Sequence, residues 1–298
     1  MVKLYQNFPH EIVPIEDFPH RAYYCFSCIC DGRLIVGGGK TKIHVDLHDV
    51  FEYTGGHWKQ LPPYSGDNGP SGANLAAAYI DNHLVVCGGY ESGGINNIVY
   101  ILRIDANYCS QEWVTCQDRL PVYIHSHQLT YFMGKLILTG GIEGDLEGAE
   151  LATNRVWEGT FHDVGPNITW RPLPSMRIRR PCHVALALED KLFVIGGGDV
   201  EKEEIPLMSE KDEKILTVTT CEYFNGKTWK IGPDLDYPLY YAAATPDRNG
   251  RSIIIGGKDS SRSYVSPKLI SFHPKKGFQN IETVELPEPR YGHVALLC

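Results

Sequence analysis

The sequence repeats one short pattern five times, an apolar run followed closely by two glycines. The copies are Leu34-Ile35-Val36 before Gly38-Gly39, Leu84-Val85-Val86 before Gly88-Gly89, Leu136-Ile137-Leu138 before Gly140-Gly141, Leu192-Phe193-Val194 before Gly196-Gly197, and Ile253-Ile254-Ile255 before Gly256-Gly257. The first glycines of successive pairs are 50 to 60 residues apart. Such a period is typical of arrays in which a single unit cannot bury its own apolar faces and neighbouring units bury them by stacking.

A turn signal precedes each apolar run, and a basic residue or histidine follows each turn. The turns are Asp31-Gly32, Asp81-Asn82, Met133-Gly134, Glu189-Asp190 and Asn249-Gly250. Asp, Asn and Gly tolerate positive φ, which two-residue hairpins require. The sequence therefore predicts a tight hairpin at the start of every unit.

Each unit continues with a variable loop, a strand that ends in an aromatic residue, and a tryptophan. Tyr53 and Trp58 show this order in the first unit, and Tyr223 and Trp229 in the fourth. The second and third units end at Trp113 and Trp170, and the fifth has Phe278 in place of tryptophan. Each unit thus predicts four antiparallel strands, which we name a to d. The units span residues 20–63, 71–121, 122–174, 177–235 and 237–287.

The joint recurrence of Gly-Gly, the aromatic residue and the tryptophan resembles the kelch repeat. The resemblance covers residues 20 to 298 and implies an all-β fold, a kelch-type β-propeller of four-stranded antiparallel blades in a single domain of residues 1–298. Five blades are complete. Residues 290–298 match the strand a sequence that begins at Arg180, and residues 2–15 supply outer strands. We expect these closing strands to form an abbreviated sixth blade; in the alternative, a five-bladed ring, residues 291–298 serve the first blade.

Charge and composition narrow the class of partner. The chain has a net charge of -8 and a sequence pI near 5.8. Nucleic-acid binding needs a basic surface, so the negative net charge disfavours a nucleic-acid partner.

The sequence also predicts the compartment. No apolar stretch approaches the roughly 20 residues of a membrane span, and residues 1–19 do not have the pattern of a signal peptide. We expect a cytoplasmic protein, with the nucleus as the other compartment. The nine cysteines are odd in number and form no dense disulfide pattern.

Strand order divides the propeller into two faces. The short a–b and c–d turns lie on one face, here called the turn face. The b–c and d–a loops lie on the other, here called the loop face. The b–c loops vary in length, and variable loops on one face of a repeat array mark its binding face. They span residues 40–48, 90–96, 142–153, 198–217 and 258–266.

The loop face carries arginines and tyrosines, the residue types that dominate interaction hot spots. The predicted partner-binding residues are Arg21, Tyr123, Arg177, Arg179, Arg180, Tyr240, Arg290 and Tyr291 from the d–a loops, and Tyr90, Lys258 and Arg262 from the b–c loops. Arginine matches carboxylates bidentately, so an acidic or carboxylate-terminated protein segment is the fitting partner. The alternative is that arginines at the start of strand a only bond neighbouring loops.

Candidate chemistry is sparse. No nucleophile elbow, Walker loop or zincin helix occurs, and the sequence predicts no catalytic residues, metal or cofactor. His127, His183 and His293 fall in one column of strand a, where the other units place Cys25, Leu75 and Ala243. Repeat spacing explains this column without a metal. Cys25, Cys28 and Cys30 form C-x-x-C-x-C on a strand, with Cys28 and Cys30 on one face, and are expected to fill space as small apolar residues.

By resemblance, the chain is expected to be a protein–protein interaction module, either a substrate receptor of a ubiquitin ligase or a cytoskeletal or scaffold adaptor. The alternative is a small-molecule enzyme of the kelch-like oxidase or sugar epimerase type that uses the central pocket. A third possibility is that the chain is one domain of a longer protein.

Overall fold

The structure is a computed structural model, which describes residues 5–8, 11–14, 16–62, 69–104, 112–144, 148–163, 167–200, 215–246, 250–259 and 262–293. These residues form strands and loops with no α-helix, and hence no helix that could cross a membrane.

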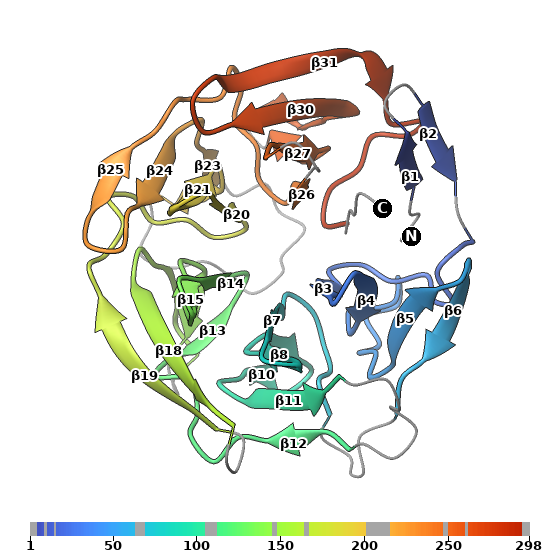
Figure 1. Cartoon of the computed structure of the whole chain (residues 1–298), viewed down its shortest axis with the longest axis vertical. Coiled ribbons are helices and arrows are strands. Elements are labelled where there is room, and N and C mark those ends of the chain that lie inside the picture. The colour runs from blue at the N-terminus through green and yellow to red at the C-terminus, as the bar shows by residue number, and fades with distance from the viewer. Residues whose placement is uncertain are drawn as a thin grey trace.

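Five four-stranded antiparallel sheets make up most of the fold, and each has the order a-b-c-d. They are blade 1 with β3 (Phe26–Cys30), β4 (Arg33–Gly37), β5 (Val50–Thr54) and β6 (His57–Gln60); blade 2 with β7 (Ala76–Ile80), β8 (His83–Cys87), β11 (Val99–Arg103) and β12 (Val114–Thr115); blade 3 with β14 (Gln128–Phe132), β15 (Lys135–Thr139), β18 (Val156–His162) and β19 (Asn167–Leu173); blade 4 with β20 (Val184–Leu188), β21 (Lys191–Ile195), β24 (Cys221–Phe224) and β25 (Trp229–Ile231); and blade 5 with β26 (Ala243–Pro246), β27 (Ser252–Ile255), β30 (Lys268–His273) and β31 (Gly277–Glu285). Figure 1 shows them arranged around a centre with the a strands innermost. The predicted all-β propeller fold of four-stranded blades is confirmed.

The predicted two-residue hairpins occur in blades 1 to 4, where for example Cys30 pairs with Arg33 and Leu188 with Lys191. The prediction for the fifth turn was wrong. Pro246 pairs with Ser252, so five residues rather than two connect β26 and β27. The longer connection shifts strand a by one residue, and Ala242 instead of Ala243 occupies the column of His127.

The glycine pairs join each blade to the next. The second glycine of each pair donates its N–H to a carbonyl of the following d–a loop at 2.6–3.0 Å. The pairs are Gly39 to Gly72, Gly89 to Ile124, Gly141 to Arg180, Gly197 to Leu239 and Gly257 to Arg290. A Cβ on the first glycine would lie within 3.0 Å of the same carbonyl oxygen, and its φ is positive in every copy. Only glycine allows this approach.

A closed ring of backbone hydrogen bonds surrounds the centre. Six residues with φ between 54° and 59° each donate an N–H to the carbonyl of the preceding member at 2.9–3.2 Å. In order they are Tyr24, Asn74, Ser126, Cys182, Tyr241 and Gly292, and Tyr24 closes the ring by donating to Gly292. Five members belong to the five blades, and the C-terminal segment takes a sixth place.

The N-terminal hairpin lies beside this sixth place. Figure 1 shows β1 (Tyr5–Phe8) and β2 (Glu11–Pro14), an antiparallel pair, between blade 5 and blade 1. The carbonyl of Glu16 accepts the indole N–H of Trp58 at 3.2 Å, as the carbonyl of Pro174 accepts that of Trp229 at 2.7 Å. Residues 16–24 thus enter blade 1 as a d–a loop does. This supports the abbreviated sixth blade, which stays a prediction because residues 294–298 lie outside the described residues.

The apolar core lies between neighbouring blades. One cluster joins blades 1 and 2 through residues such as Ile35 and Leu84, and another joins blades 2 and 3 through Val85 and Leu136. Strand b contributes most, because its aliphatic residues are almost fully buried on both faces. Burial of a Leu, Ile or Val side chain contributes about 1.5–3 kcal/mol, so stacking blades stabilises the array.

Short strands extend the b–c loops on the loop face. They are β9 (Tyr90–Glu91) with β10 (Gly94–Ile95); β16 (Ile142–Gly144) with β17 (Glu150–Ala152) and β13 (Tyr123–His125); β22 (Gly198–Val200) with β23 (Ile215–Thr217); and β28 (Lys258–Asp259) with β29 (Tyr264–Val265). Single bridges such as Ala73 with Tyr90 join d–a loops to the same hairpins. The described parts of the loop face therefore contain paired backbone that joins the b–c hairpins to the d–a loops.

Candidate functional site

Exposed apolar side chains gather on the loop face. Twelve large apolar side chains are exposed among the described residues, and seven lie in b–c or d–a loops: Tyr23, Ile43, Val45, Tyr123, Leu151, Tyr264 and Tyr291. Ile43 is 81% exposed at the tip of the first b–c loop. Single exposed apolar residues are ordinary, but a concentration on one face is typical of an interaction site.

Most of the predicted partner-binding residues do face solvent. The side chains of Arg21, Tyr123, Arg177, Arg179, Arg262 and Tyr291 are exposed, and Tyr90 and Lys258 are half-buried. Lys258 Nζ lies 5.4 Å from the ring centroid of Tyr291, a cation–π contact that orders both side chains. Arg262 Nε lies 3.7 Å from the buried Asp259 carboxylate. The structure thus places basic and aromatic groups together on this face.

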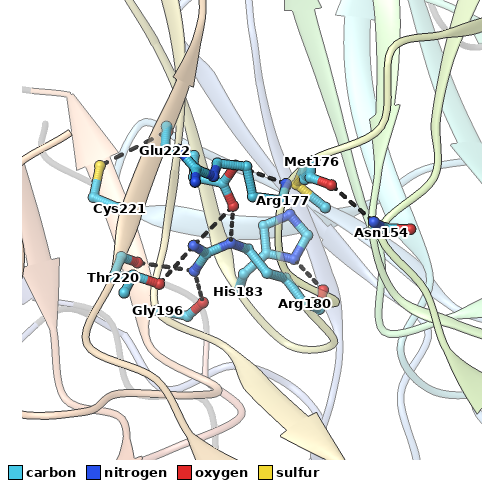
Figure 2. Close-up of polar contacts among 9 residues, drawn as sticks. All are labelled: Asn154, Met176, Arg177, Arg180, His183, Gly196, Thr220, Cys221 and Glu222. Carbon is cyan, nitrogen blue, oxygen red and sulfur yellow. Dashed lines mark hydrogen bonds and ion pairs between the residues drawn. The ribbon is translucent and has the colours of Figure 1, made fainter. Parts of the chain in front are cut away.

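Arg180 is a correction to the predicted set, because its side chain is completely buried. Figure 2 shows its guanidinium surrounded by acceptors: Nη1 donates to the carbonyls of Gly196 and Thr220 at 2.7 and 2.8 Å, and Nη2 donates to Thr220 Oγ1 at 2.7 Å. Nη2 also pairs with Glu222 Oε1 at 3.1 Å. Arg180 therefore ties the d–a loop to strands b and c of its own blade and cannot reach a partner.

Tyr240 and Arg290 are also largely enclosed. Tyr240 is 7% exposed, with its ring 5.1 Å from that of Tyr241. The Arg290 side chain is 10% exposed, and Nη2 pairs with Glu288 Oε2 at 2.7 Å. Arg290 is the counterpart of Arg180 in the C-terminal segment, which explains its burial. For Arg290 the alternative, an arginine at the start of strand a that only bonds neighbouring loops, fits better than partner contact, and the enclosed Tyr240 offers little surface to a partner.

A polar network orders the loop face between blades 1 and 2. Lys40 Nζ lies 3.3 Å from the Asp46 carboxylate and 4.5 Å from the ring centroid of Tyr90. Asp46 also accepts the Ser92 amide at 2.8 Å and the Ser92 hydroxyl at 2.5 Å. Burial disfavours the ionised Asp46, but the Ser92 hydrogen bonds and Lys40 outweigh burial and lower its pKa. The network holds two b–c loops in one arrangement.

The histidine column packs between blades. Each of His127, His183 and His293 lies against the first glycine of the preceding blade. His183 Nε2 is 2.9 Å from Thr139 Oγ1, and His127 Nε2 is 3.5 Å from Cys87 Sγ. Burial lowers the pKa of His127 and His183 to about 3 and that of His293 to about 4, so all three are neutral at pH 7. The part of the chain that the structure describes contains no group of three or more His, Cys, Asp or Glu side chains placed to hold a metal.

The cysteine motif is divided as the strand alternation predicts. Cys28 and Cys30 pack in the cluster between blades 1 and 2, while Cys25 packs against the opposite side of blade 1. Burial raises the pKa of Cys25 to about 12. Thiolate is the reactive form of cysteine, so the raised pKa suppresses reactivity and suits a space-filling role.

No family model matches the chain. Kelch domain-containing protein 2 from Homo sapiens is 25% identical over 199 residues, which cover 57% of this chain and 49% of that protein. The Bos taurus protein of the same name is 26% identical over the same coverage. The chain is similar to kelch-domain proteins. It spans about half the length of these curated relatives.

Sequence reasoning missed several exposed residues of this kelch-like face. Tyr23, Ile43, Val45, Leu151 and Tyr264 are not arginines or repeat-motif residues, and they vary from loop to loop. The signal that could have found them is an apolar residue inside a polar b–c loop, as in Lys42-Ile43-His44-Val45. An apolar residue at such a position has no apolar cluster beside it to pack against, so its side chain stays exposed.

Proposed function

We propose that this kelch-like propeller is a protein-interaction module that binds a protein or peptide through its loop face. The observation that carries the proposal is the presence of seven exposed apolar side chains on that face, which also exposes Arg21, Arg177, Arg179 and Arg262. Tyrosine and arginine form the centres of interaction surfaces, since both combine large contact area with directed hydrogen bonds.

The partner chemistry follows from the charges on the loop face. The exposed guanidiniums of Arg177 and Arg179 can each receive a carboxylate through two parallel hydrogen bonds. We therefore infer that the partner presents an acidic or carboxylate-terminated segment, with an apolar residue that contacts Ile43 and Val45. A substrate-receptor role in a ubiquitin ligase and a cytoskeletal or scaffold adaptor role both use such a surface, and a cytoplasmic or nuclear location suits either. We propose no nucleic-acid partner, no membrane partner and no catalytic role for this protein.

The experiment is affinity capture from cell lysate with mass spectrometry, comparing the parent with matched variants. The loop-face variants are Arg177→Ala with Arg179→Ala, and Ile43→Ala. The controls are Arg171→Ala and Ile231→Ala, which remove an exposed arginine and an exposed isoleucine from outer strands. We expect a partner that is retained by the controls and lost by the loop-face variants, with all proteins melting alike. Equal capture by all variants would show that binding lies elsewhere.

The enzyme alternative predicts a different result. Stoichiometric metal in the purified protein, or a metabolite that raises the melting temperature, would favour catalysis in the central cavity over partner binding. The rise in melting temperature caused by such a metabolite should disappear when the central cavity is blocked. It should be unchanged in Arg177→Ala.

A further inference from the structure

The centre of the propeller contains a cup that is distinct from the loop face. Its volume is about 540 Å³, and the a strands of blades 1 to 5 line it. The lining reaches Ile29, Tyr79, Tyr131 and Ala187, which lie next to the a–b turns, so the cup extends to the turn face. No Asp, Glu, Lys or Arg is present among the described residues of the lining. An uncharged interior of this volume suits an uncharged ligand group of moderate size.

The mouth of the cup is apolar. Ile29 is 39% exposed and Tyr131 is 46% exposed, and both line the cup. They are two of the five exposed large apolar side chains that lie off the loop face in the described part of the chain. Rings and aliphatic groups around a cavity mouth can hold an entering side chain by its flat faces.

The rim of the mouth carries acidic residues at the a–b turns of blades 1 and 2. Asp31 and Asp81 occupy turn positions with φ of 51° and 46° and are exposed. The basic residue after the first turn, Arg33, lies 3.6 Å from the buried Glu52. His83 is 5% exposed. Blades 1 and 2 therefore present two carboxylates at the mouth, while the cationic or polar groups beside them are withdrawn.

The wall of the cup also holds unused hydrogen-bonding groups. Ser252 is completely buried, and its Oγ has no partner within the described residues. The same is true of both ring nitrogens of His293. Both residues line the cup. A buried polar group without a partner is destabilising, so a ligand that brings a hydrogen bond to either group gains affinity.

We propose that the cup binds one aromatic side chain with a polar tip, tryptophan or tyrosine, from a protein segment that carries basic residues on both sides of it. The ring enters between Ile29, Tyr79 and Tyr131, its N–H or O–H reaches the unused groups of the wall, and the flanking basic residues meet Asp31 and Asp81. This second interaction surface lies on the turn face and does not depend on the loop-face proposal.

The test uses short acetylated and amidated peptides titrated calorimetrically into the full chain at low salt. The probe has a central tryptophan flanked by lysines. The matched controls exchange tryptophan for alanine, or lysine for glutamate. We expect saturable binding of the probe, about tenfold or more weaker binding of the alanine peptide, and loss of binding with glutamate. No saturation at millimolar probe, or equal binding of the glutamate peptide, would overturn the proposal.

Variants locate the site. Asp31→Asn and Asp81→Asn remove charge while keeping a residue that tolerates positive φ. Together they should weaken probe binding several-fold at low salt and less at high salt, because salt screens exposed charges. Ala187→Trp fills the cup and should abolish binding, and Ala187→Ser is its matched control. Arg177→Ala with Arg179→Ala should leave probe binding unchanged.

A second measurement does not depend on how the variants fold. A probe with a photoreactive benzophenone in place of the indole should crosslink to the parent chain at the cup mouth, near Ile29, Tyr79 or Tyr131. Crosslinks confined to the loop face, for example at Tyr291 or Arg179, would refute the assignment.

Discussion

Replacing Arg180 by methionine should destabilise the propeller strongly, whereas the same change at its exposed neighbour Arg179 should have little effect. Arg180 donates to the carbonyls of Gly196 and Thr220, to the Thr220 hydroxyl and to Glu222, all in the interior (Figure 2). Methionine keeps the length of the side chain but leaves Glu222, which is 2% exposed, with the Arg177 N–H at 2.8 Å as a remaining donor. Loss of one partner of a buried ion pair costs about 3–5 kcal/mol. The retained Arg177 bond places the expected loss near 3–4 kcal/mol.

The corresponding shift in melting temperature follows from chain length. Unfolding entropy of about 2.1 cal/mol/K per residue gives about 0.6 kcal/mol/K for this chain, if it unfolds in one transition. A loss of 3–4 kcal/mol therefore lowers the Tm by about 5–6 °C. Differential scanning calorimetry and urea unfolding both measure this.

Two further variants make the reasoning refutable. Arg179→Met, at an exposed site, should change stability by no more than about 0.5 kcal/mol. Arg180→Met combined with Glu222→Met removes the buried charge as well and should lose less than Arg180→Met alone. If Arg180→Met melts like Arg179→Met, the guanidinium is not holding the loop to its blade.

Three other outcomes follow from the geometry. Burial lowers the pKa of His183 to about 3 from 6.5, so the unfolded chain binds more protons in that window. The free energy of unfolding measured in urea should therefore be highest above about pH 6.5 and should decrease as the pH falls towards 3. The decrease should be smaller in His183→Gln, and parallel pH profiles of the two proteins would contradict this. Gly196→Ala forces a Cβ against a carbonyl of the next blade, whereas Gly55→Ala has open space at a similar positive φ. Gly55→Ala should cost about 1 kcal/mol and Gly196→Ala clearly more, and equal denaturation midpoints would refute the packing role of the glycine pair. Burial raises the pKa of Cys25 and Cys221 to about 12, so both should react with a disulfide reagent at pH 8 only after denaturant is added, and mass-spectrometric mapping of fast labelling at either one would count against this.

The blade architecture could be predicted from sequence because its determinants are local and repeated. Gly38-Gly39 and Asp31-Gly32 each encode a backbone requirement, and Trp58 a packing requirement, that recurs in the same register. The fifth hairpin was predicted wrongly. Asn249-Gly250 has the composition of a two-residue turn, but the pairing of Pro246 with Ser252 sets a register that a two-residue turn there does not fit. Turn residues limit the backbone conformations, and the pairing of the strands determines the length of the connection.

The candidate site was predictable only in part, because residue type does not fix side-chain direction in a loop. Arg177, Arg179 and Arg180 read alike in sequence, yet Arg180 alone is completely buried. Its direction is set by Glu222, 42 residues away along the chain. Ile43 was overlooked for the opposite reason, since apolar residues are expected inside and its loop offers no interior.

The closed hydrogen-bonded ring has a consequence for how the chain folds. The bond between Tyr24 and Gly292 joins positions about 270 residues apart, whereas every other bond of the ring joins neighbouring units about 50–60 residues apart. Closing the longer loop costs only about 1.5 kcal/mol more in chain entropy, but it cannot begin until nearly the whole sequence has left the ribosome. Blades 1 to 5 can stack as they emerge, each on the one before. Until Gly292 arrives, the nascent stack exposes two terminal blade faces to other chains, and closure of the ring removes both at once.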